Sequence, residues 1–445
     1  MTRSIRSHPL KLRLVTSDSE RAIPFPNPEQ TVLMPSFGKD EPTGLYDLYS
    51  ISVAMHELER ELHNSVEARK GIRKVIIPLT RNTLRDIDQE AVSRVLSELS
   101  LAIFSKSIEF GFEPHTYYQT DFEHEYEEYD AICLFSGGAD SFVGVLDSKD
   151  KYGDVLALNV RHDHSNAVNG YVARLKKNVL DPEDIVLERI DVPKQIGKGY
   201  SQTRGIVYQA CAGISAFRHS SNRVVLSECG TTMYQPSFGL FDRVTYTSDP
   251  LVQNASQKLV KELLDYKLEI ATPFENGTKS EMFASSRRKE QLRDTFSCIS
   301  SRFGQNLGCC YGCAIRRMGF LVAGVEDCQY MYDLFSINDD APLSRYGRGM
   351  GAGRTTDLLE LMRFSLDLLV DYESIEPIKR RRIDRHHKHD LFRRFALDTF
   401  ASLSIVTENE GIRNKRIEKA FNDALNYIER ADLEKRIESV RRLSR

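Results

Sequence analysis

Short runs of apolar and β-branched residues alternate with helical patterns from residue 131 onward, and this alternation narrows the possible folds more than any other feature. The runs are residues 131–135, 155–160, 184–190 and 223–227, and a weaker candidate spans 267–271. Helical patterns occupy residues 166–180 and 202–219 between them. Strands that alternate with helices form βαβ units and build a parallel sheet. The sequence therefore predicts an α/β core.

The flanks of this core have a different texture. Residues 1–125 indicate an α+β region, with a strand at 74–79 and a helical pattern at 84–104. An acidic tract without Lys or Arg, residues 121–130, then predicts a solvated linker. After the core, the sequence predicts helices from about residue 355 to 372 and beyond 415. We therefore divide the chain into residues 1–125, 126–328 and 329–445.

Composition excludes several classes of protein. Apolar residues make up 41% of the 445 residues and charged residues 28%, which suits packed domains and not a disordered chain. Lys and Arg number 61 against 64 Asp and Glu, so a globally basic nucleic-acid binder is not favoured. No apolar run approaches the ~18 residues of a membrane-spanning helix, and the N-terminus lacks a secretory apolar stretch. We expect a cytoplasmic protein without a membrane partner.

A glycine-rich turn directly follows the first apolar run, at Ser136-Gly137-Gly138-Ala139-Asp140-Ser141. A strand would deliver this turn to the carboxyl edge of the sheet, and the next helix would aim its free N–H groups at the same place. Two glycines allow the backbone to approach a ligand closely. The serine hydroxyls suit phosphate oxygens, whereas Asp140 would repel them unless a cation such as Mg²⁺ lies between. The turn lacks the lysine of a Walker loop.

The segment SGGADS resembles the SGGxDS loop of the PP-loop ATP pyrophosphatases. The resemblance implies an enzyme with an adenine nucleotide alpha hydrolase-like core that cleaves ATP to AMP and pyrophosphate. The acyl or urea-like oxygen activated in this way is then attacked by a nitrogen or sulfur nucleophile.

Three further segments resemble the QueC family of 7-cyano-7-deazaguanine synthases. Asn159-Val160-Arg161-His162 follows a strand as the Arg-His pair of that family does, and Thr203 to Val207 opens an apolar helix. Cys313-Ala-Ile-Arg-Arg-Met-Gly-Phe320 is similar to the end of the family's C-x8-C-x2-C-x2-C pattern. The likeness covers about residues 131–320.

Clustered cysteines in a large intracellular chain indicate metal or redox chemistry. Cys298, Cys310 and Cys313 match the family spacing, but Leu307 stands where the second ligand belongs. Cys309 is the expected substitute and Cys328 the alternative. Four thiolates would form a closed, structural Zn²⁺ site.

The resemblance also implies roles for residues near the predicted sheet edge. The candidate catalytic residues are Asp140, Ser141, Lys279, Arg204 and His162. Candidate ATP ligands are Ser136, Gly137, Gly138, Asp140, Ser141 and Arg161, and Glu228 and Gly230 are substrate-site candidates. Lys279 and Arg204 would neutralise the leaving pyrophosphate, and His162 would assist proton transfer or hydrogen-bond the nucleotide.

In size and layout, with long flanks on both sides of the core, the chain is more similar to the QueC-like proteins of bacterial antiphage operons than to the QueC enzymes themselves. These operons include the Qat system (QatC) and type IV CBASS. This likeness implies activation of a 7-deazaguanine carboxylate and its conjugation to an amine, on a partner protein from the same operon. One alternative is an enzyme that makes the free nitrile. Another is a tRNA thiolation enzyme that uses Cys229 or Cys211, and a third is an ATP-binding subunit without catalysis.

Two more segments have open interpretations. Residues 379–394 carry eight Lys and Arg residues against two Asp, which indicates a solvated surface helix or a site for nucleic acid or an acidic partner. The glycine-arginine segment 345–354 indicates a linker or a loop that gates the substrate. Cys133, inside an apolar run, is expected to be a buried small hydrophobe.

Overall fold

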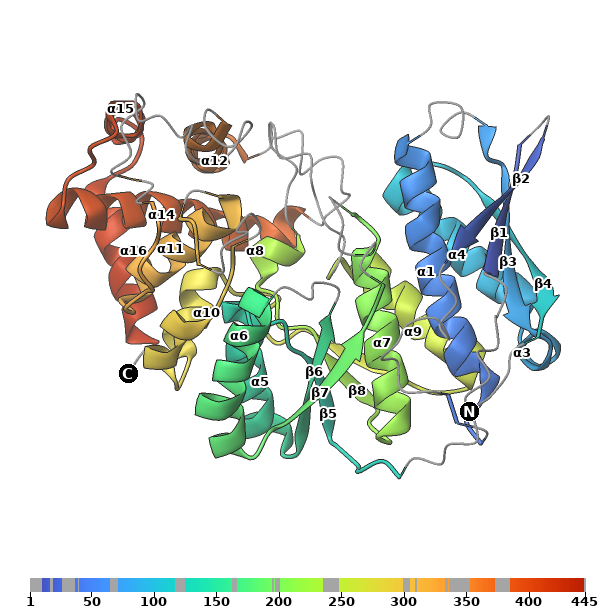
Figure 1. Cartoon of the computed structure of the whole chain (residues 1–445). Coiled ribbons are helices and arrows are strands. Elements are labelled where there is room, and N and C mark those ends of the chain that lie inside the picture. Colours follow the sequence, from blue (N-terminus) through green and yellow to red (C-terminus); the bar gives the residue numbers. More distant parts are fainter. Residues whose placement is uncertain are drawn as a thin grey trace.

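The chain was analysed as a computed structural model, in which two β-sheets and a group of C-terminal helices lie next to one another (Figure 1). The structure describes residues 10–16, 19–25, 37–38, 40–64, 71–116, 125–161, 166–193, 196, 201–234, 248–298, 305–308, 310–332, 335, 353–372 and 385–443. Statements below concern these residues.

The N-terminal sheet has four strands in the order β2-β1-β3-β4. Its strands are β1 (Leu10–Val15), β2 (Glu20–Phe25), β3 (Lys74–Thr80) and β4 (Glu109–His115). β1 pairs antiparallel with β2 and β3, whereas β3 and β4 are parallel. The helices of this region are α1 (Thr43–Asn64), α3 (Arg81–Asp86) and α4 (Gln89–Phe104).

The helical pattern predicted over residues 84–104 is divided into two helices. Asp88 ends the first run because its side chain accepts the backbone N–H groups of Glu90 and Ala91, which caps the start of α4. The apolar residues of the pattern, Val92, Leu96 and Leu99, are buried on the inner face of α4. The predicted strand at 74–79 is confirmed as β3.

The central sheet has five parallel strands in the order β7-β6-β5-β8-β9. They are β5 (Ala131–Leu134), β6 (Val155–Arg161), β7 (Val186–Asp191), β8 (Arg223–Val225) and β9 (Glu269–Ala271), which confirms the predicted parallel sheet. The helices are α5 (Ala139–Tyr152), α6 (Asn166–Leu175), α7 (Arg204–Arg218), α8 (Gly230–Met233), α9 (Pro250–Leu264), α10 (Lys279–Ser285) and α11 (Tyr311–Ala323). A π-helical turn, Lys176–Leu180, and 3-10 turns at Asp181–Glu183 and Lys289–Asp294 complete this part.

Each face of the central sheet packs against its own hydrophobic core, because successive strand residues point to opposite faces. Ala131 and Cys133 of β5 belong to the core that contains α5, α10, α11 and the C-terminal helices. Ile132, between them, belongs to the core that contains α1, α7 and α9. The second core continues into the N-terminal sheet through Leu12 and Ile77. The N-terminal region and the central sheet therefore share one continuous hydrophobic core.

The C-terminal region is helical, as predicted, and covers α10 and α11 (Figure 1). Its helices are α12 (Gly353–Val370), α14 (Arg385–Asn409), α15 (Lys415–Ala424) and α16 (Arg430–Arg442). Phe392 and Phe400 of α14 are fully buried in the first core. None of the helices in the described part of the chain combines the length and hydropathy that a bilayer crossing demands.

The described part of the basic segment 379–394 corrects the expectation of a solvated surface helix. Lys388, only 5% exposed, donates to Glu275 and Asn276, and Arg394 binds Glu281. Among the Lys and Arg side chains described in this segment, only that of Arg393 is exposed. Residues 379–384 and most of the segment 345–354 lie outside the described residues.

Candidate functional site

The order of the central strands creates a topological switch point at β5, the place where open α/β sheets form a crevice for ligands. β5 lies between β6 and β8, and the chain proceeds from β5 to β6 on one side and reaches β8 only later on the other. Open α/β sheets bind ligands at such a switch point, outside the carboxyl ends of the strands. The loop after β5 and the first turn of α5 contain the SGGADS segment, whereas Glu228 lies in the loop after β8 and Gly230 begins α8. Two of the segments predicted from sequence therefore meet at this crevice.

The SGG turn has the backbone shape that its glycines permit. Gly137 has φ +78°, and a Cβ built on it would lie 2.9 Å from Val172 Cγ2, so a side chain is excluded there on two grounds. Gly138 is the N-cap of α5 and supplies no side chain to cap its first N–H groups. The Ser136 and Ser141 hydroxyls lie 3.2 Å apart at the mouth of this helix. Phosphate oxygens suit this set of groups.

A buried ion pair joins the turn to helix α10. Lys279 Nζ lies 2.6 and 2.8 Å from the two carboxylate oxygens of Asp140. The two side chains are 17% and 18% exposed. Burial lowers the pKa of Lys279, but the Asp140 carboxylate and other nearby acidic groups outweigh burial, and the pKa lies above its ordinary value. The lysine is therefore charged at neutral pH, 139 residues along the chain from its partner.

Glu228 lies beside this pair. Burial raises the pKa of Glu228, a hydrogen bond from the Ser248 hydroxyl lowers it in part, and the charge of Asp140 raises it again. The neighbouring thiol of Cys229 is buried between two threonine hydroxyls, and burial raises its pKa as well. The crevice thus gathers an aspartate, a glutamate and a lysine. The lysine could neutralise phosphate charge directly, whereas the carboxyl groups could do so only through a bound cation.

Gly230 has a packing role at the same edge. Its N–H donates to the carbonyl oxygens of Phe274 and Gly277, and a Cβ there would lie 1.8 Å from Glu275 O. The backbone of the loop before α10 therefore approaches the start of α8 closely only because residue 230 is glycine. His162, the candidate proton-transfer residue, lies outside the described residues.

The two arginine candidates bind other parts of the protein. Arg161, at the end of β6, forms a bidentate ion pair with Asp191 on β7 and also donates to Asn169. Arg204, the first residue of α7, donates from Nε to Ile196 O at 3.0 Å. The structure thus brings Asp140, Lys279 and Glu228 together but ties both arginines to segments beyond the β5–β8 crevice.

The donor set of the crevice fits Mg²⁺ and a triphosphate. Mg²⁺ takes one or two carboxylates and completes its octahedron with phosphate oxygens and water. Asp140 offers such a carboxylate next to the serine hydroxyls and the open end of α5. Glu228, half-buried beside it, is a second acidic group within the same loop pair.

Three of the predicted metal ligands come together beneath α11. Cys298, Cys310 and Cys313 are buried, and their sulfur atoms all lie within 4.8 Å of one another. Cys310 is the N-cap of α11 and Cys313 lies in its first turn. The hydrogen bond with Cys298, together with burial, raises the pKa of Cys310 to about 11, although the hydrogen bond with Cys313 lowers it in part. A bound metal would therefore have to displace protons. Cys309, the expected fourth ligand, lies outside the described residues.

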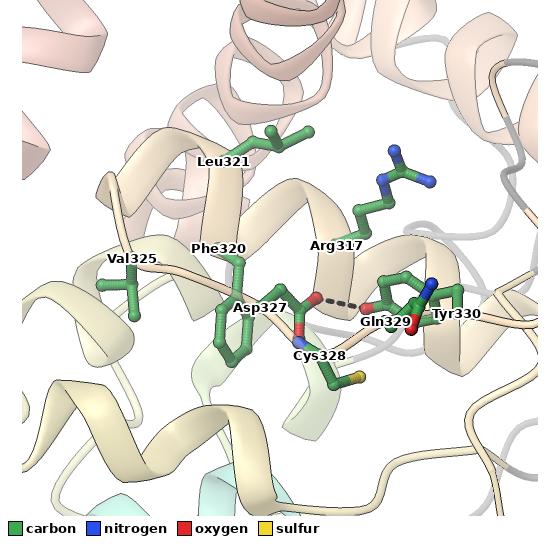
Figure 2. Close-up of a pocket in the computed structure, with 8 residues that line it drawn as sticks. All are labelled: Arg317, Phe320, Leu321, Val325, Asp327, Cys328, Gln329 and Tyr330. Atoms are coloured by element: carbon green, nitrogen blue, oxygen red, sulfur yellow. Dashed lines mark hydrogen bonds between the residues drawn. The ribbon is translucent and has the colours of Figure 1, made fainter.

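Cys328 is not part of this thiol group. Its sulfur accepts a hydrogen bond from Asn306 Nδ2 at 3.2 Å. Figure 2 shows Cys328 on the wall of a pocket formed by the end of α11 and the segment after it, next to the hydrogen-bonded pair of Asp327 and Tyr330. The alternative that Cys328 completes the metal site is therefore not supported by its position.

Arg316 organises the cysteine site, and sequence reasoning missed this role. Its guanidinium, 1% exposed, binds Asp327 and donates to Thr295 O, Thr295 Oγ1, Ser297 Oγ and Leu292 O. These acceptors belong to the segment that leads to Cys298. A signal was present, because Arg316 lies three residues after Cys313 and four before Phe320, on the inner face of a helix.

The same helix also contacts the lysine of the crevice. A Cβ built on Gly319 would lie 3.0 Å from Phe283 Cε2 and 3.2 Å from Lys279 Cγ. Phe283 and Phe320 pack edge to face with ring centroids 4.7 Å apart. α11 thus packs directly onto α10, and the cysteine site supports the helix that begins with Lys279.

Comparison with known proteins adds no family assignment. A scan against protein-family models found no match, and a search of curated proteins also found none. The function proposed below therefore relies on the residues of this chain and their geometry.

Proposed function

We propose that the chain is a PP-loop ATP pyrophosphatase that activates a carboxylate through its adenylate and transfers the acyl group to an amine. The observation that carries the proposal is the Asp140–Lys279 pair at the mouth of α5, at the switch point of a parallel sheet. A phosphate turn, a metal-binding carboxylate and a lysine that can neutralise a leaving phosphate are the groups that this reaction requires.

The chemistry follows from where these groups lie. The SGG turn and the Ser141 hydroxyl would hold the pyrophosphate end of ATP, with Mg²⁺ on Asp140 neutralising charge. A carboxylate oxygen of the substrate attacks the α-phosphorus, and pyrophosphate leaves with the bonding electron pair while Lys279 balances its charge. The amine then attacks the acyl carbon, loses a proton and expels AMP, which retains the attacking carboxylate oxygen.

The substrate and the acceptor are finer parts of the proposal. Similarity to the QueC family around Cys313 and Arg161 favours 7-carboxy-7-deazaguanine as the carboxylate, and the large flanks favour an amine on a partner protein in antiphage defence. The buried thiols speak against thiolation, because burial raises the pKa of both Cys211 and Cys229 and the thiolate is the nucleophile.

The nucleotide products test the proposal. Wild-type protein with ATP, Mg²⁺, the acid and ammonia as the amine should release AMP and pyrophosphate, and Asp140→Ala should abolish this release without loss of fold. Asp154→Ala, which removes an exposed carboxylate just beyond α5, is the control and should leave the rate unchanged. Normal AMP production by Asp140→Ala would contradict the assignment of the turn.

The acceptor needs a separate experiment. Incubation with ATP, Mg²⁺, the acid and either ammonia or the protein encoded next to this one should give a covalent mass increase on that neighbouring protein. Efficient nitrile formation from ammonia, without labelling of the protein, would instead make the chain a nitrile synthase with additional flanks.

A further inference from the structure

The first turn of α10 is held from outside the central domain. Thr278 is the N-cap of the helix, and its hydroxyl and the Glu281 side chain form a capping box. Of the residues from Thr278 to Glu281, all but Lys279 bind the C-terminal helices. Lys279 points the other way and binds Asp140.

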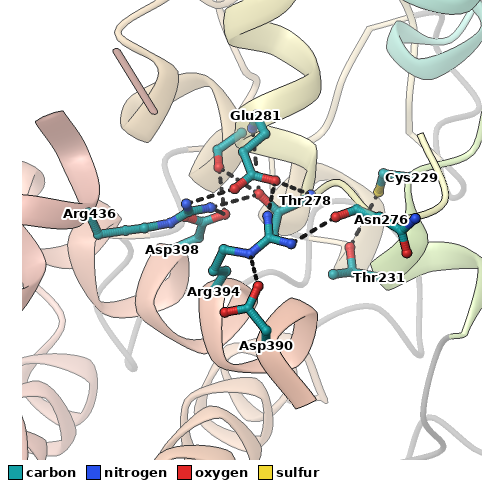
Figure 3. Close-up of polar contacts among 10 residues, drawn as sticks. Cys229, Thr231, Asn276, Thr278, Glu281, Asp390, Arg394, Asp398 and Arg436 are labelled. Atoms are coloured by element: carbon teal, nitrogen blue, oxygen red, sulfur yellow. Dashed lines mark hydrogen bonds and ion pairs between the residues drawn. The ribbon is translucent and has the colours of Figure 1, made fainter. Parts of the chain in front are cut away.

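Two buried side chains make these contacts. Asp398 of α14 accepts a hydrogen bond from Ser280 Oγ at 2.5 Å, and Arg436 of α16 binds Asp398 at 2.7 Å. Arg436 also donates to Glu281 Oε1 at 2.7 Å and to Thr278 Oγ1 at 3.1 Å. Figure 3 shows Arg436 and Asp398 converging on Thr278 and Glu281 from the C-terminal helices. We call Asp398 and Arg436 the clamp.

Burial of the two charged groups of the clamp costs desolvation free energy. Stabilisation of the fold alone therefore does not explain well why these charges are buried here. Its side chains are 7% and 5% exposed. A buried ion pair is often no more stabilising than apolar residues of similar volume, because desolvation offsets the attraction between the charges. What an ion pair with several directed hydrogen bonds does supply is a fixed orientation. In this structure the ion pair orients the first turn of α10, which contains Lys279.

We propose that Asp398 and Arg436 are positioning residues that aim Lys279 at the phosphate turn. The C-terminal region would then be a working part of the site, separate from any use of this region in binding a partner. The proposal rests on the proposed function for the chemistry that Lys279 performs. The geometric part, that the clamp sets the position of Lys279, does not depend on it.

The decisive variant is the double substitution Asp398→Leu/Arg436→Met. It replaces the buried pair by apolar side chains, so the fold should be retained. The hydroxyls of Thr278 and Ser280 lose their contacts to the clamp and keep only those within the first turn of α10. A matched control is Glu438→Leu/Arg442→Met, which removes an exposed ion pair of α16, 68% and 73% exposed. The thermal midpoint of each protein is measured first.

The first measurement follows Lys279 without any need for activity. Limited acetylation, quantified by peptide mass spectrometry, should label Lys279 several-fold faster in the clamp variant than in wild type. Lys149 is an internal reference, because its side chain is 21% exposed against 17% for Lys279 and it lies far from the clamp in sequence. The control variant should label both lysines at the wild-type rate.

The second measurement is the rate of AMP release. We expect kcat to fall by about 10- to 100-fold in the clamp variant, as for misplacement of a catalytic group, with the KM for the acid unchanged. Wild-type kcat and wild-type Lys279 labelling in a folded clamp variant would overturn the proposal. If wild-type protein releases no AMP at all, the proposed function fails, and the labelling rates still decide whether the clamp positions Lys279.

Discussion

Substitution of Arg316 by methionine isolates the contribution of one buried cation to the cysteine site. The side chain keeps most of its volume but loses the guanidinium. Asp327 is then left with donors from Tyr330 and its own neighbouring backbone only. The acceptors at Leu292 and Thr295, to which Arg316 donates at 2.6 to 3.1 Å, each lose one donor. Leu292 O keeps the donors of Thr295, and Thr295 O keeps Asn306 Nδ2.

The expected cost is large for a single residue. Removing one partner of a buried ion pair destabilises a protein by about 3–5 kcal/mol, because the remaining charge stays buried. The neighbouring Arg317→Met is the matched control. Arg317 is half-buried and lies over the rings of Tyr330 and Phe335 at 5.6 and 4.7 Å, and loss of such contacts costs about 0.5–1 kcal/mol.

Denaturant unfolding followed by far-UV circular dichroism measures the difference, since the chain has no tryptophan to report by fluorescence. The rate at which a chelator removes bound zinc gives a second, local readout. We expect Arg316→Met to unfold at lower denaturant and to lose metal faster than Arg317→Met. Equal unfolding midpoints and equal metal loss for the two variants would refute the role given to Arg316.

Three further predictions follow from single contacts. Gly144→Ala should destabilise the fold by about 1–3 kcal/mol, because the new Cβ would lie 1.8 Å from Ser227 Oγ. Gly170→Ala, which has open space around it, should stabilise the fold by about 0.5–1 kcal/mol. Equal thermal unfolding midpoints for the two variants would contradict this prediction. Burial raises the pKa of Asp47 to about 6, although hydrogen bonds from Thr83 and Thr80 offset part of the rise. Between about pH 4 and 6, Asp47 of the folded protein therefore retains a proton that the unfolded chain has lost. The contribution of Asp47 to stability should therefore fall by up to about 3 kcal/mol as pH rises from about 4 to 6. The difference in unfolding free energy between wild type and Asp47→Asn, measured across that range, should show this slope. Fresh, reduced protein should contain about one Zn²⁺ per chain, which Cys313→Ser should lose together with part of the thermal stability; metal analysis without zinc would reject the site.

The sequence predicted the local pattern of the core well. Each β-branched run from residue 131 to 227 contains a strand, and the SGG turn lies between β5 and α5 as expected. These features depend on contacts near in sequence and on side-chain periodicity, which a single sequence displays. The nearness of Cys298, Cys310 and Cys313 was predicted from the resemblance to the QueC cysteine pattern. The start of one helix brings Cys310 and Cys313 together, whereas Cys298 lies on the preceding segment.

The long-range polar contacts could not be predicted in this way. Glu59 of α1 accepts the N–H groups of Gln202 and Thr203, which lie 143 and 144 residues away and precede Arg204. Arg436 reaches Glu281 over 155 residues. No periodicity in the sequence indicates that such distant residues are partners. A run of charged residues such as 385–394 has the composition of a solvated helix face, although Lys388 within it is buried. Buried polar contacts thus join both flanks to the central domain, and the sequence alone does not reveal them.

The central claim is that a carboxylate of the substrate attacks the α-phosphorus of ATP at the SGG turn. It is tested most directly by following whether a carboxylate oxygen of the acid is transferred to AMP. The substrate acid is prepared with ¹⁸O in its carboxyl group, and the AMP formed with ATP, Mg²⁺ and an amine acceptor is analysed by mass spectrometry. We predict that AMP from wild-type protein gains one ¹⁸O atom from the acid and that Asp140→Ala forms none of this product. AMP without the label, or ADP and phosphate as the products, would contradict the account.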